Sequence, residues 1–224
     1  MLFDLRSRHR RRAVKVTYSV LALLMGGGLV LFGVGTGQSG GGLLNAFGGG
    51  GSSGAQNQAV NQQETAALKQ VKLRPNDPQA WGNLLTARWT TATSGNDYTT
   101  TGGFTVAGRA ELDRVVQAWG RYSQLTKSPD PDLATLAARA YAALGNYSGA
   151  ASAWEIEAAS SPTVSKGYEC LAVSAYAAGD TRKGELAAAK ALSLIPKAQQ
   201  ATTKLTLNQA KSSPSVAKSY AAQC

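Results

Sequence analysis

Two glycines and two prolines recur at one fixed spacing, and this spacing constrains the fold more than any other feature of the sequence. Gly145 and Gly179 are 34 residues apart, and Pro162 and Pro196 have the same separation. An Ala-rich segment with helical periodicity follows each glycine and ends near each proline. Glycine suits a helix-to-helix turn that needs a positive φ, and proline cannot continue a helix. The spacing therefore predicts repeated helix-turn-helix units.

The residues around these positions resemble the tetratricopeptide repeat (TPR) family over residues 60–212, with repeats that begin at Pro78, Pro131 and Ser165. In the second repeat the residues that occupy the family's packing and turn positions are Tyr141, Gly145, Tyr147, Ala150 and Trp154. The resemblance implies an all-α, helix-turn-helix solenoid of three repeats. A half repeat with a helix at about Asn61–Leu73 would precede them. A capping helix at Ala198–Lys211, with Leu205 and Leu207 facing inward, would follow them.

One repeat departs from the expected length. Trp81 and Trp119 are 38 residues apart, where the repeat pattern implies about 20. We expect the second helix of this repeat at Ala110–Leu125 and the additional residues in a polar loop at 93–108. A long loop inside a regular repeat is either a functional element or a tolerated surface insertion.

The first 59 residues have the composition of a membrane anchor and a tether. Residues 1–15 hold six basic side chains and one acidic one, and residues 16–34 hold no charged residue. Nineteen helical residues span roughly 28 Å, close to the hydrocarbon thickness of a bilayer. The pattern predicts a single transmembrane helix with its N-terminus inside. A cleavable signal peptide is the alternative, but no Ala-x-Ala site follows the apolar run. Residues 35–59 are rich in Gly and Ser and predict a flexible, disordered linker.

Composition and motifs argue against several other functions. The net charge is +10, but half of it comes from residues 1–15, so we expect no nucleic-acid binding. No phosphate-binding loop, nucleophile elbow or histidine-based metal motif is present in the sequence. Glu155 and Glu157 are two residues apart on a predicted helix and should point in different directions. We therefore expect no enzyme activity, no catalytic, cofactor-binding or metal-binding residues, and no cofactor.

The resemblance also implies a partner-binding face, because the family binds partners along the concave side formed by the first helix of each repeat. The family's concave positions fall here on Gln79, Thr86, Trp89, Thr90, Thr135, Arg139, Lys166, Glu169, Val173 and Tyr176. Members that grip a peptide carboxylate use Lys, Arg and Asn at defined positions, of which only Lys166 is matched. The partner is therefore expected to be an unidentified protein or extended peptide of another kind.

The two cysteines, Cys170 and Cys224, leave two alternatives open. Outside the cytoplasm a disulfide between them would persist, and the residues after Lys211 would let Cys224 fold back onto the third repeat. Otherwise they are two independent free thiols. We expect residues 213–224 to form a frayed tail.

Together these features predict a membrane-anchored scaffold for protein–protein interaction at the outer face of a bacterial cytoplasmic membrane. By family analogy such proteins assist secretion, envelope assembly or division. One alternative is a structural protein that self-associates as a homodimer, because Gly26-Gly27-Gly28 would let two membrane helices approach closely. Another alternative is an accessory subunit of an envelope enzyme complex.

Overall fold

The computed structural model describes residues 53–94, 97–98 and 103–224, with only the backbone of residues 53–58. The predicted basic segment 1–15, the predicted membrane helix 16–34 and most of the predicted linker lie outside the described residues. Among the described helices, none combines the length and the apolar character needed to span a bilayer. Residues Ser52–Cys224 form one compact unit.

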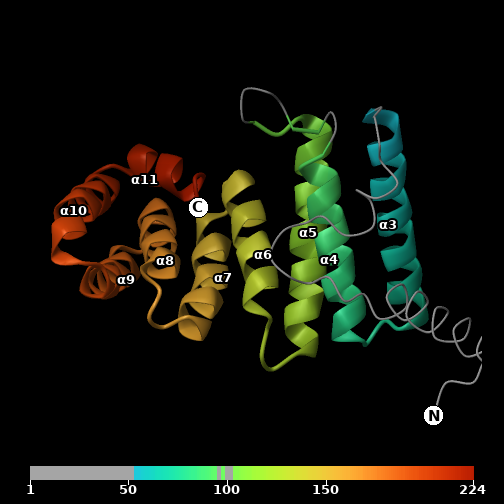
Figure 1. The fold of residues 1–224 in the computed structure, drawn as a ribbon, viewed down its shortest axis with the longest axis horizontal. Helices are drawn as coiled ribbons and strands as arrows, with labels where there is room; N and C mark the ends of the chain where they lie inside the picture. The colour runs from blue at the N-terminus through green and yellow to red at the C-terminus, as the bar shows by residue number, and fades with distance from the viewer. Residues whose placement is uncertain (1–52, 95–96, 99–102) are drawn as a thin grey trace, which may run out of the picture. The chain divides into compact units, whose positions relative to one another are not determined.

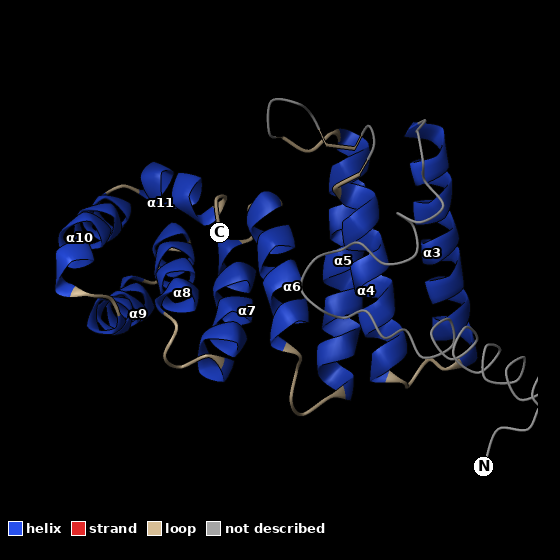
Figure 2. Ribbon diagram, in the orientation of Figure 1, coloured by secondary structure: helices blue, strands red, loops and turns tan. Residues whose placement is uncertain are grey.

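This unit is all-α throughout its described residues, as the sequence predicts (Figure 2). Tyr98 and Phe104 form an isolated antiparallel bridge outside any strand. In chain order the helices are α3 (Ser53–Leu73), α4 (Pro78–Ala92), α5 (Val106–Leu125), α6 (Pro131–Ala143), α7 (Tyr147–Ser160), α8 (Ser165–Ala177), α9 (Thr181–Leu194), α10 (Lys197–Ser212) and α11 (Pro214–Ala221).

The helices stand in a row of hairpins, and each helix from α3 to α9 packs against the next one in sequence (Figure 1). The hairpins are α4–α5, α6–α7 and α8–α9. Gly145 and Gly179 form the turns of the last two hairpins with φ values of 80° and 83°. Both turns carry the same backbone hydrogen bonds, one of which runs from Asn146 N to Tyr141 O and its equivalent from Asp180 N to Ala175 O. The predicted role of the two glycines is confirmed, and the arrangement is compatible with a helical repeat solenoid.

Side-chain caps fix where the helices begin. Asp77 accepts a hydrogen bond from Gln79 N at 3.0 Å, and Asp130 accepts one from Asp132 N at 2.8 Å. A proline follows each of these aspartates at the first helical position, where its missing N–H costs nothing. The two Asp-Pro pairs therefore start α4 and α6, the first helices of their hairpins.

Small side chains bring the paired helices close together. The ring of Tyr141 on α6 lies over Gly149 on α7, and the ring of Tyr176 on α8 lies over Gly184 on α9. In both cases an added Cβ would overlap the tyrosine ring. Fully buried alanines fill the rest of these interfaces, including Ala134, Ala137, Ala138, Ala140 and Ala150.

The additional residues of the first hairpin lengthen its two helices as well as its loop. Its second helix, α5, begins at Val106 and not at Ala110, because Thr105 caps it by accepting a hydrogen bond from Gly108 N. The helix has 20 residues, against 14 in α7, and α4 has 15, against 13 in α6. About half of the additional residues therefore lengthen the helices, and the connection between α4 and α5 holds the others.

Three other sequence predictions are wrong. The helix α3 begins at Ser53, inside the predicted linker 35–59, because residues 55–73 contain no glycine and are rich in helix-forming residues. Leu205 is 59 % exposed while Leu207 is buried, because residues two apart lie on different sides of a helix. Residues 213–224 are not frayed: they form α11, which packs back onto α8.

The contact between Gly184 and Tyr176 yields a prediction for stability. Gly184→Ala should lower the free energy of unfolding by about 1–3 kcal/mol, since the new methyl group displaces a buried ring. Gly120 on α5 is the matched control because an added Cβ there meets nothing within 4 Å. Gly120→Ala should raise the free energy of unfolding by up to about 1 kcal/mol through helix propensity. Chemical denaturation of the two variants measures the contrast, and equal effects would contradict the tight contact.

Candidate functional site

The residues predicted to bind a partner lie on the first helices of the three hairpins, and we call this surface the first-helix face. Its members on α4 are Gln79, Thr86, Trp89 and Thr90, those on α6 are Thr135 and Arg139, and those on α8 are Lys166, Glu169, Val173 and Tyr176. The face is open on α4 and α6, whereas on α8 Lys166 is exposed, Glu169 is half-buried, and Val173 and Tyr176 are buried.

The open part is a groove of about 250 Å³ between α4 and α6. Gly82 lies at the bottom, where a Cβ would come within 2.9 Å of Leu133 Cδ1. The two helices can therefore approach closely at this point, and a groove lies beside the contact. The lining residues are Pro78, Gln79, Gly82, Asn83, Thr86, Tyr122, Thr126, Asp130 and Leu133.

The polar groups of this groove are mostly neutral. Asp130 is the one charged side chain among its lining residues, and this carboxylate already caps α6. The Tyr122 hydroxyl accepts a hydrogen bond from Asp130 N at 2.9 Å and keeps its own proton to donate. Gln79 and Thr86 are exposed at the rim. Amide and hydroxyl groups of this kind suit the N–H and C=O groups of a peptide backbone better than a charged end group.

Trp89 and Thr90, farther along α4, contribute less to this groove. Trp89 is half-buried and packs against the core. The Thr90 hydroxyl donates to Thr86 O at 3.0 Å and is satisfied within its own helix. Neither residue lines the groove between α4 and α6.

The helix α11 packs against α8 near Cys170, whereas the Tyr176 ring lies over Gly184 of α9 and Lys166 is exposed. Val173 and Tyr176 are only 4 % and 7 % exposed, so neither is available to a partner in this conformation. A disulfide joins Cys170 on α8 to Cys224 just after α11, with the two Cα atoms 5.7 Å apart. Arg139 Nε donates a hydrogen bond to the backbone oxygen of Cys224 at 3.0 Å. Sequence reasoning considered the cysteine pair but missed the helix α11.

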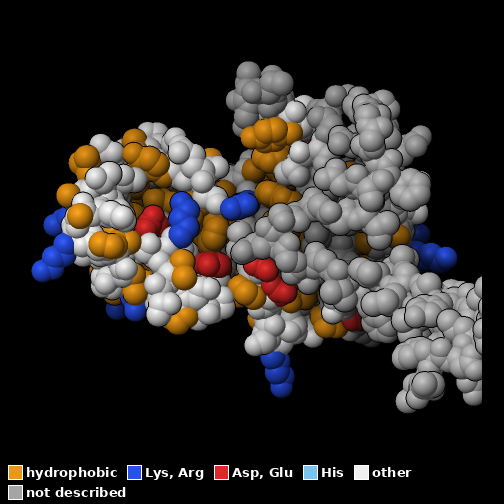
Figure 3. All heavy atoms as spheres, viewed as in Figure 1, with side chains coloured by type: hydrophobic (Ala, Val, Ile, Leu, Met, Phe, Trp, Pro, Cys, Tyr) orange, Lys and Arg blue, Asp and Glu red, His pale blue; other side chains and the backbone are white. Residues whose placement is uncertain are grey.

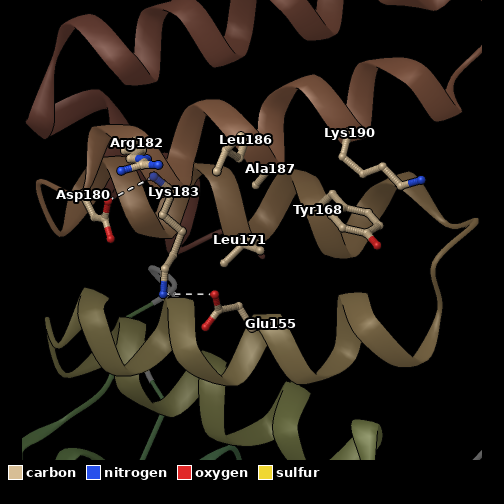
Figure 4. A pocket seen from close by; sticks show the side chains of 9 residues that line it. All are labelled: Glu155, Tyr168, Leu171, Asp180, Arg182, Lys183, Leu186, Ala187 and Lys190. Atoms are coloured by element: carbon tan, nitrogen blue, oxygen red, sulfur yellow. Dashed lines mark hydrogen bonds and ion pairs between the residues drawn. The ribbon is translucent and has the colours of Figure 1, made fainter.

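A second groove, of about 430 Å³, lies between α7, α8 and α9 (Figure 4). Leu171 and Ala187 contribute apolar surface to it, and Leu186 beside them is 67 % exposed. Lys183 Nζ lies 3.1 Å from Glu155 Oε1 and crosses the groove, and Lys190 Nζ lies 5.8 Å from the centre of the Tyr168 ring. Sequence reasoning did not identify this groove, although Leu186 and Lys190 share one side of α9 by their spacing.

Charged side chains of both signs occur on the described surface. In Figure 3 basic and acidic side chains of the described helices are interspersed on the face in view. The described residues contain no group of three or more His, Cys, Asp or Glu side chains that could hold a metal ion.

An ionic cluster joins α3 to the first hairpin. Arg88 Nε on α4 lies 3.6 Å from Glu64 Oε1 on α3, and Arg88 Nη1 donates to Arg114 O on α5 at 3.1 Å. Glu111 pairs with Arg114 on α5. Burial raises the pKa of Glu111, and the negative charge of Glu64 raises it further. The cluster connects three helices, which assigns it a structural role.

Glu157 on α7 has a buried carboxylate oxygen without a hydrogen-bond partner among the described residues, as Glu111 does. This Oε2 atom of Glu157 lies against Gly167 of α8. Burial raises the pKa of Glu157 above its usual value of 4.5, and the nearby Asp132 raises it further. Glu155, two residues earlier, points to Lys183, so the two carboxylates point apart as the sequence predicts.

The raised pKa of Glu157 predicts a pH dependence of stability. The folded chain holds this proton more tightly than the unfolded chain, so the ionised carboxylate destabilises the fold above its folded pKa. Glu157→Gln should therefore raise the free energy of unfolding at pH 7 by up to about 1 kcal/mol, and the gain should vanish below about pH 4. Glu155→Gln is the matched control and should not stabilise, because Glu155 has a cationic partner. Urea unfolding at both pH values measures this, and a gain for Glu157→Gln that does not change with pH would contradict it.

No model of a known protein family matches the chain, and no curated protein matches it in sequence. The link to tetratricopeptide repeats therefore depends on residue spacing and on the arrangement of the helices.

Proposed function

We propose that this chain is a membrane-anchored, tetratricopeptide-like scaffold that binds an extended segment of another protein along its first-helix face. The observation that carries the proposal is the open polar groove between α4 and α6, on the face where the repeat pattern places partner contacts. By analogy with proteins of similar plan, the partner belongs to secretion, envelope assembly or division at the outer face of the cytoplasmic membrane.

The chemistry of the groove favours a peptide in extended conformation. An extended segment presents backbone N–H and C=O groups on both sides, and each needs a partner when it leaves water. The amide of Gln79 and the hydroxyl of Tyr122 offer donors and acceptors. Asn83 Nδ2 donates to Gln70 Oε1 at 3.0 Å, so Asn83 offers chiefly its amide oxygen. Leu133 adds an apolar contact for one side chain of the peptide. The groove has no Lys or Arg among its lining residues, so recognition of a terminal carboxylate is not proposed.

The proposed location follows from two features in different parts of the chain. Residues 16–34 have the length and composition of a membrane helix, preceded by a basic segment that should stay in the cytoplasm. The disulfide between Cys170 and Cys224 fits a compartment outside the cytoplasm, where disulfides form and persist unless a dedicated dithiol reductant acts on them. Both features favour a domain outside the cytoplasm, tethered by the glycine-rich linker.

Site-specific photo-crosslinking in native membranes tests the binding face. A photoreactive amino acid in place of Gln79 should capture a distinct protein, because Gln79 is exposed at the rim of the groove. Gln117 on α5 is the matched control, an exposed glutamine on the second helix of the same hairpin. A photoreactive residue there should capture at least about tenfold less of that protein.

Other crosslinking results would indicate one of the alternative functions or contradict the proposal. A dominant adduct between two copies of the chain would favour a self-associating structural protein. An envelope enzyme as the captured protein would favour the role of accessory subunit. Equal capture from both positions would contradict a partner site in the groove.

Reporter fusions test the proposed topology. Alkaline phosphatase is active only outside the cytoplasm, so its fusion after Cys224 should be active in bacterial cells. The same fusion to a chain that lacks residues 16–34 should be inactive, because nothing would export it. An inactive fusion to the full chain would contradict a domain outside the cytoplasm.

A further inference from the structure

The helix α11 is too short to be stable alone. It has eight residues, and isolated helices of fewer than about 12 residues are marginal in water. Its fully buried residues are Ala217 and Ala221, at 0 % and 2 % exposure, and each contributes only a methyl group. Tyr220 is partly buried and adds its ring to the contact with the core. The helix must therefore be held in place by contacts with the rest of the domain.

Four polar or covalent contacts around α11 hold it on the domain. Tyr220 Oη on α11 donates a hydrogen bond to Gln209 Oε1 on α10 at 3.1 Å. The disulfide connects Cys224 to Cys170, and Arg139 donates to the Cys224 backbone oxygen. Lys218 Nζ lies 5.8 Å from the centre of the Tyr147 ring at the start of α7. Because Arg139 and Lys218 are exposed, their contacts are weak, and the disulfide is the strongest constraint on α11.

The side of α8 that carries Cys170 is buried and mostly apolar from Cys170 onward, and Ser174 is the polar residue there. Cys170 and Val173 are buried, and so is Ser174, one turn after Cys170. The Ser174 hydroxyl is fully buried and has no hydrogen-bond partner among the described residues. Buried hydroxyls are normally paired, so α8 has a polar group on this side that the present packing leaves unsatisfied.

We propose that α11 is the displaceable occupant of a helix-binding groove on α8, and that the Cys170–Cys224 disulfide locks it there. The ligand admitted after unlocking is a short helix of another protein with small side chains at the spacing of Ala217, Ala221 and Cys224. A helix of this pattern fits because it repeats the shape that already covers α8. A polar side chain on it would also satisfy Ser174.

A second copy of the chain is a less suitable occupant. Ser213 alone connects α10 to α11. The helix α10 itself packs against α8 and α9, so α11 cannot reach another molecule unless α10 also moves. Exchange of α11 between two copies would therefore disrupt more of the domain than entry of a separate helix.

Unlocking requires a dithiol reductant and proceeds by thiol–disulfide exchange. Cys224 is partly exposed and Cys170 is not, so the reductant's thiolate attacks Sγ of Cys224. The bond between the two protein sulfurs breaks, and Cys170 leaves as a thiolate and takes up a proton. The second thiol of the reductant then attacks the mixed disulfide and releases Cys224, which is protonated in turn. The reductant loses two electrons and becomes a disulfide, and the protein gains two electrons and two protons.

This regulation rests on the proposed function in one respect, namely that a partner segment binds the first-helix face. The lock acts on α6, α8 and α11, whereas the crosslinking at Gln79 reports on the groove between α4 and α6. The two proposals can therefore fail separately, because release of α11 and binding of a peptide to α8 can be measured without a cellular partner.

Hydrogen exchange of the full chain in detergent tests the release of α11. On reduction, the amides of residues 217–221 should exchange at least about tenfold faster, because the short helix loses its covalent constraint. The amides of α9 should keep their rates, which controls for unfolding of the domain. Unchanged protection of residues 217–221 after reduction would overturn the lock.

A labelled synthetic peptide tests the groove. The probe is residues 213–224 with C224S, so that it cannot form a mixed disulfide. It should bind the reduced chain, or a C170S/C224S chain, at least about tenfold more tightly than the oxidised chain, in which α11 occupies the site. The same peptide with A217E should lose binding, since Ala217 is buried, and with A222E it should bind normally, since Ala222 is exposed.

Three results would overturn the proposed groove. The first is equal affinity of the probe for the oxidised and reduced chains. The second is equal behaviour of the A217E and A222E peptides, which would indicate non-specific binding. The third is dimerisation of the reduced chain in place of peptide binding, which would assign the site to a second copy.

Discussion

Close approach of helices through small side chains is the constraint on which the described domain depends. Glycines at 149 and 184 each receive a tyrosine ring from the paired helix, and alanines fill the remaining interfaces. Alanine removes little area from water, so such a core gains stability from tight packing over many small contacts. A single added methyl group at one of these glycines therefore matters more than it would at an exposed helical glycine.

The same constraint shapes the surfaces available to partners. Where Gly82 lets Leu133 approach α4, the two first helices diverge beside the contact and leave a polar groove. On α8 every residue from Cys170 to Tyr176 is buried, because α7, α9, α10 and α11 surround it. The first-helix face is thus open on α4 and α6 and buried from Cys170 to Tyr176 on α8, although the repeat pattern gives both ends the same positions.

The sequence was informative where local chemistry decides the structure. A glycine with positive φ and an Asp-Pro pair each act within a few residues, and both fixed helix boundaries correctly at Gly145, Gly179, Pro78 and Pro131. The predicted start of α5 at Ala110 was wrong because it followed from the position of Trp119 in the repeat pattern. The cap at Thr105, which starts the helix earlier, is a weaker signal in the sequence. The return of Cys224 to the third repeat was one of two alternatives from the sequence, but the helix α11 was missed, because its position depends on contacts with Cys170 and Arg139, which are 54 and 85 residues from Cys224.

The position of α11 also bears on how a row of helical hairpins ends. The last hairpin of such a row has an apolar side with no successor, and a polar-faced cap must cover it to keep the protein soluble. Here α10 covers one side of α8 and α9, and α11 covers another. A cap and a ligand meet the same requirement, since each must bury apolar surface with small, complementary side chains. A cap differs from a ligand in how strongly it is attached to the domain. On this argument a disulfide at the end of the cap, and not the packing of two alanine methyl groups, determines whether the side of α8 that carries Cys170 remains closed.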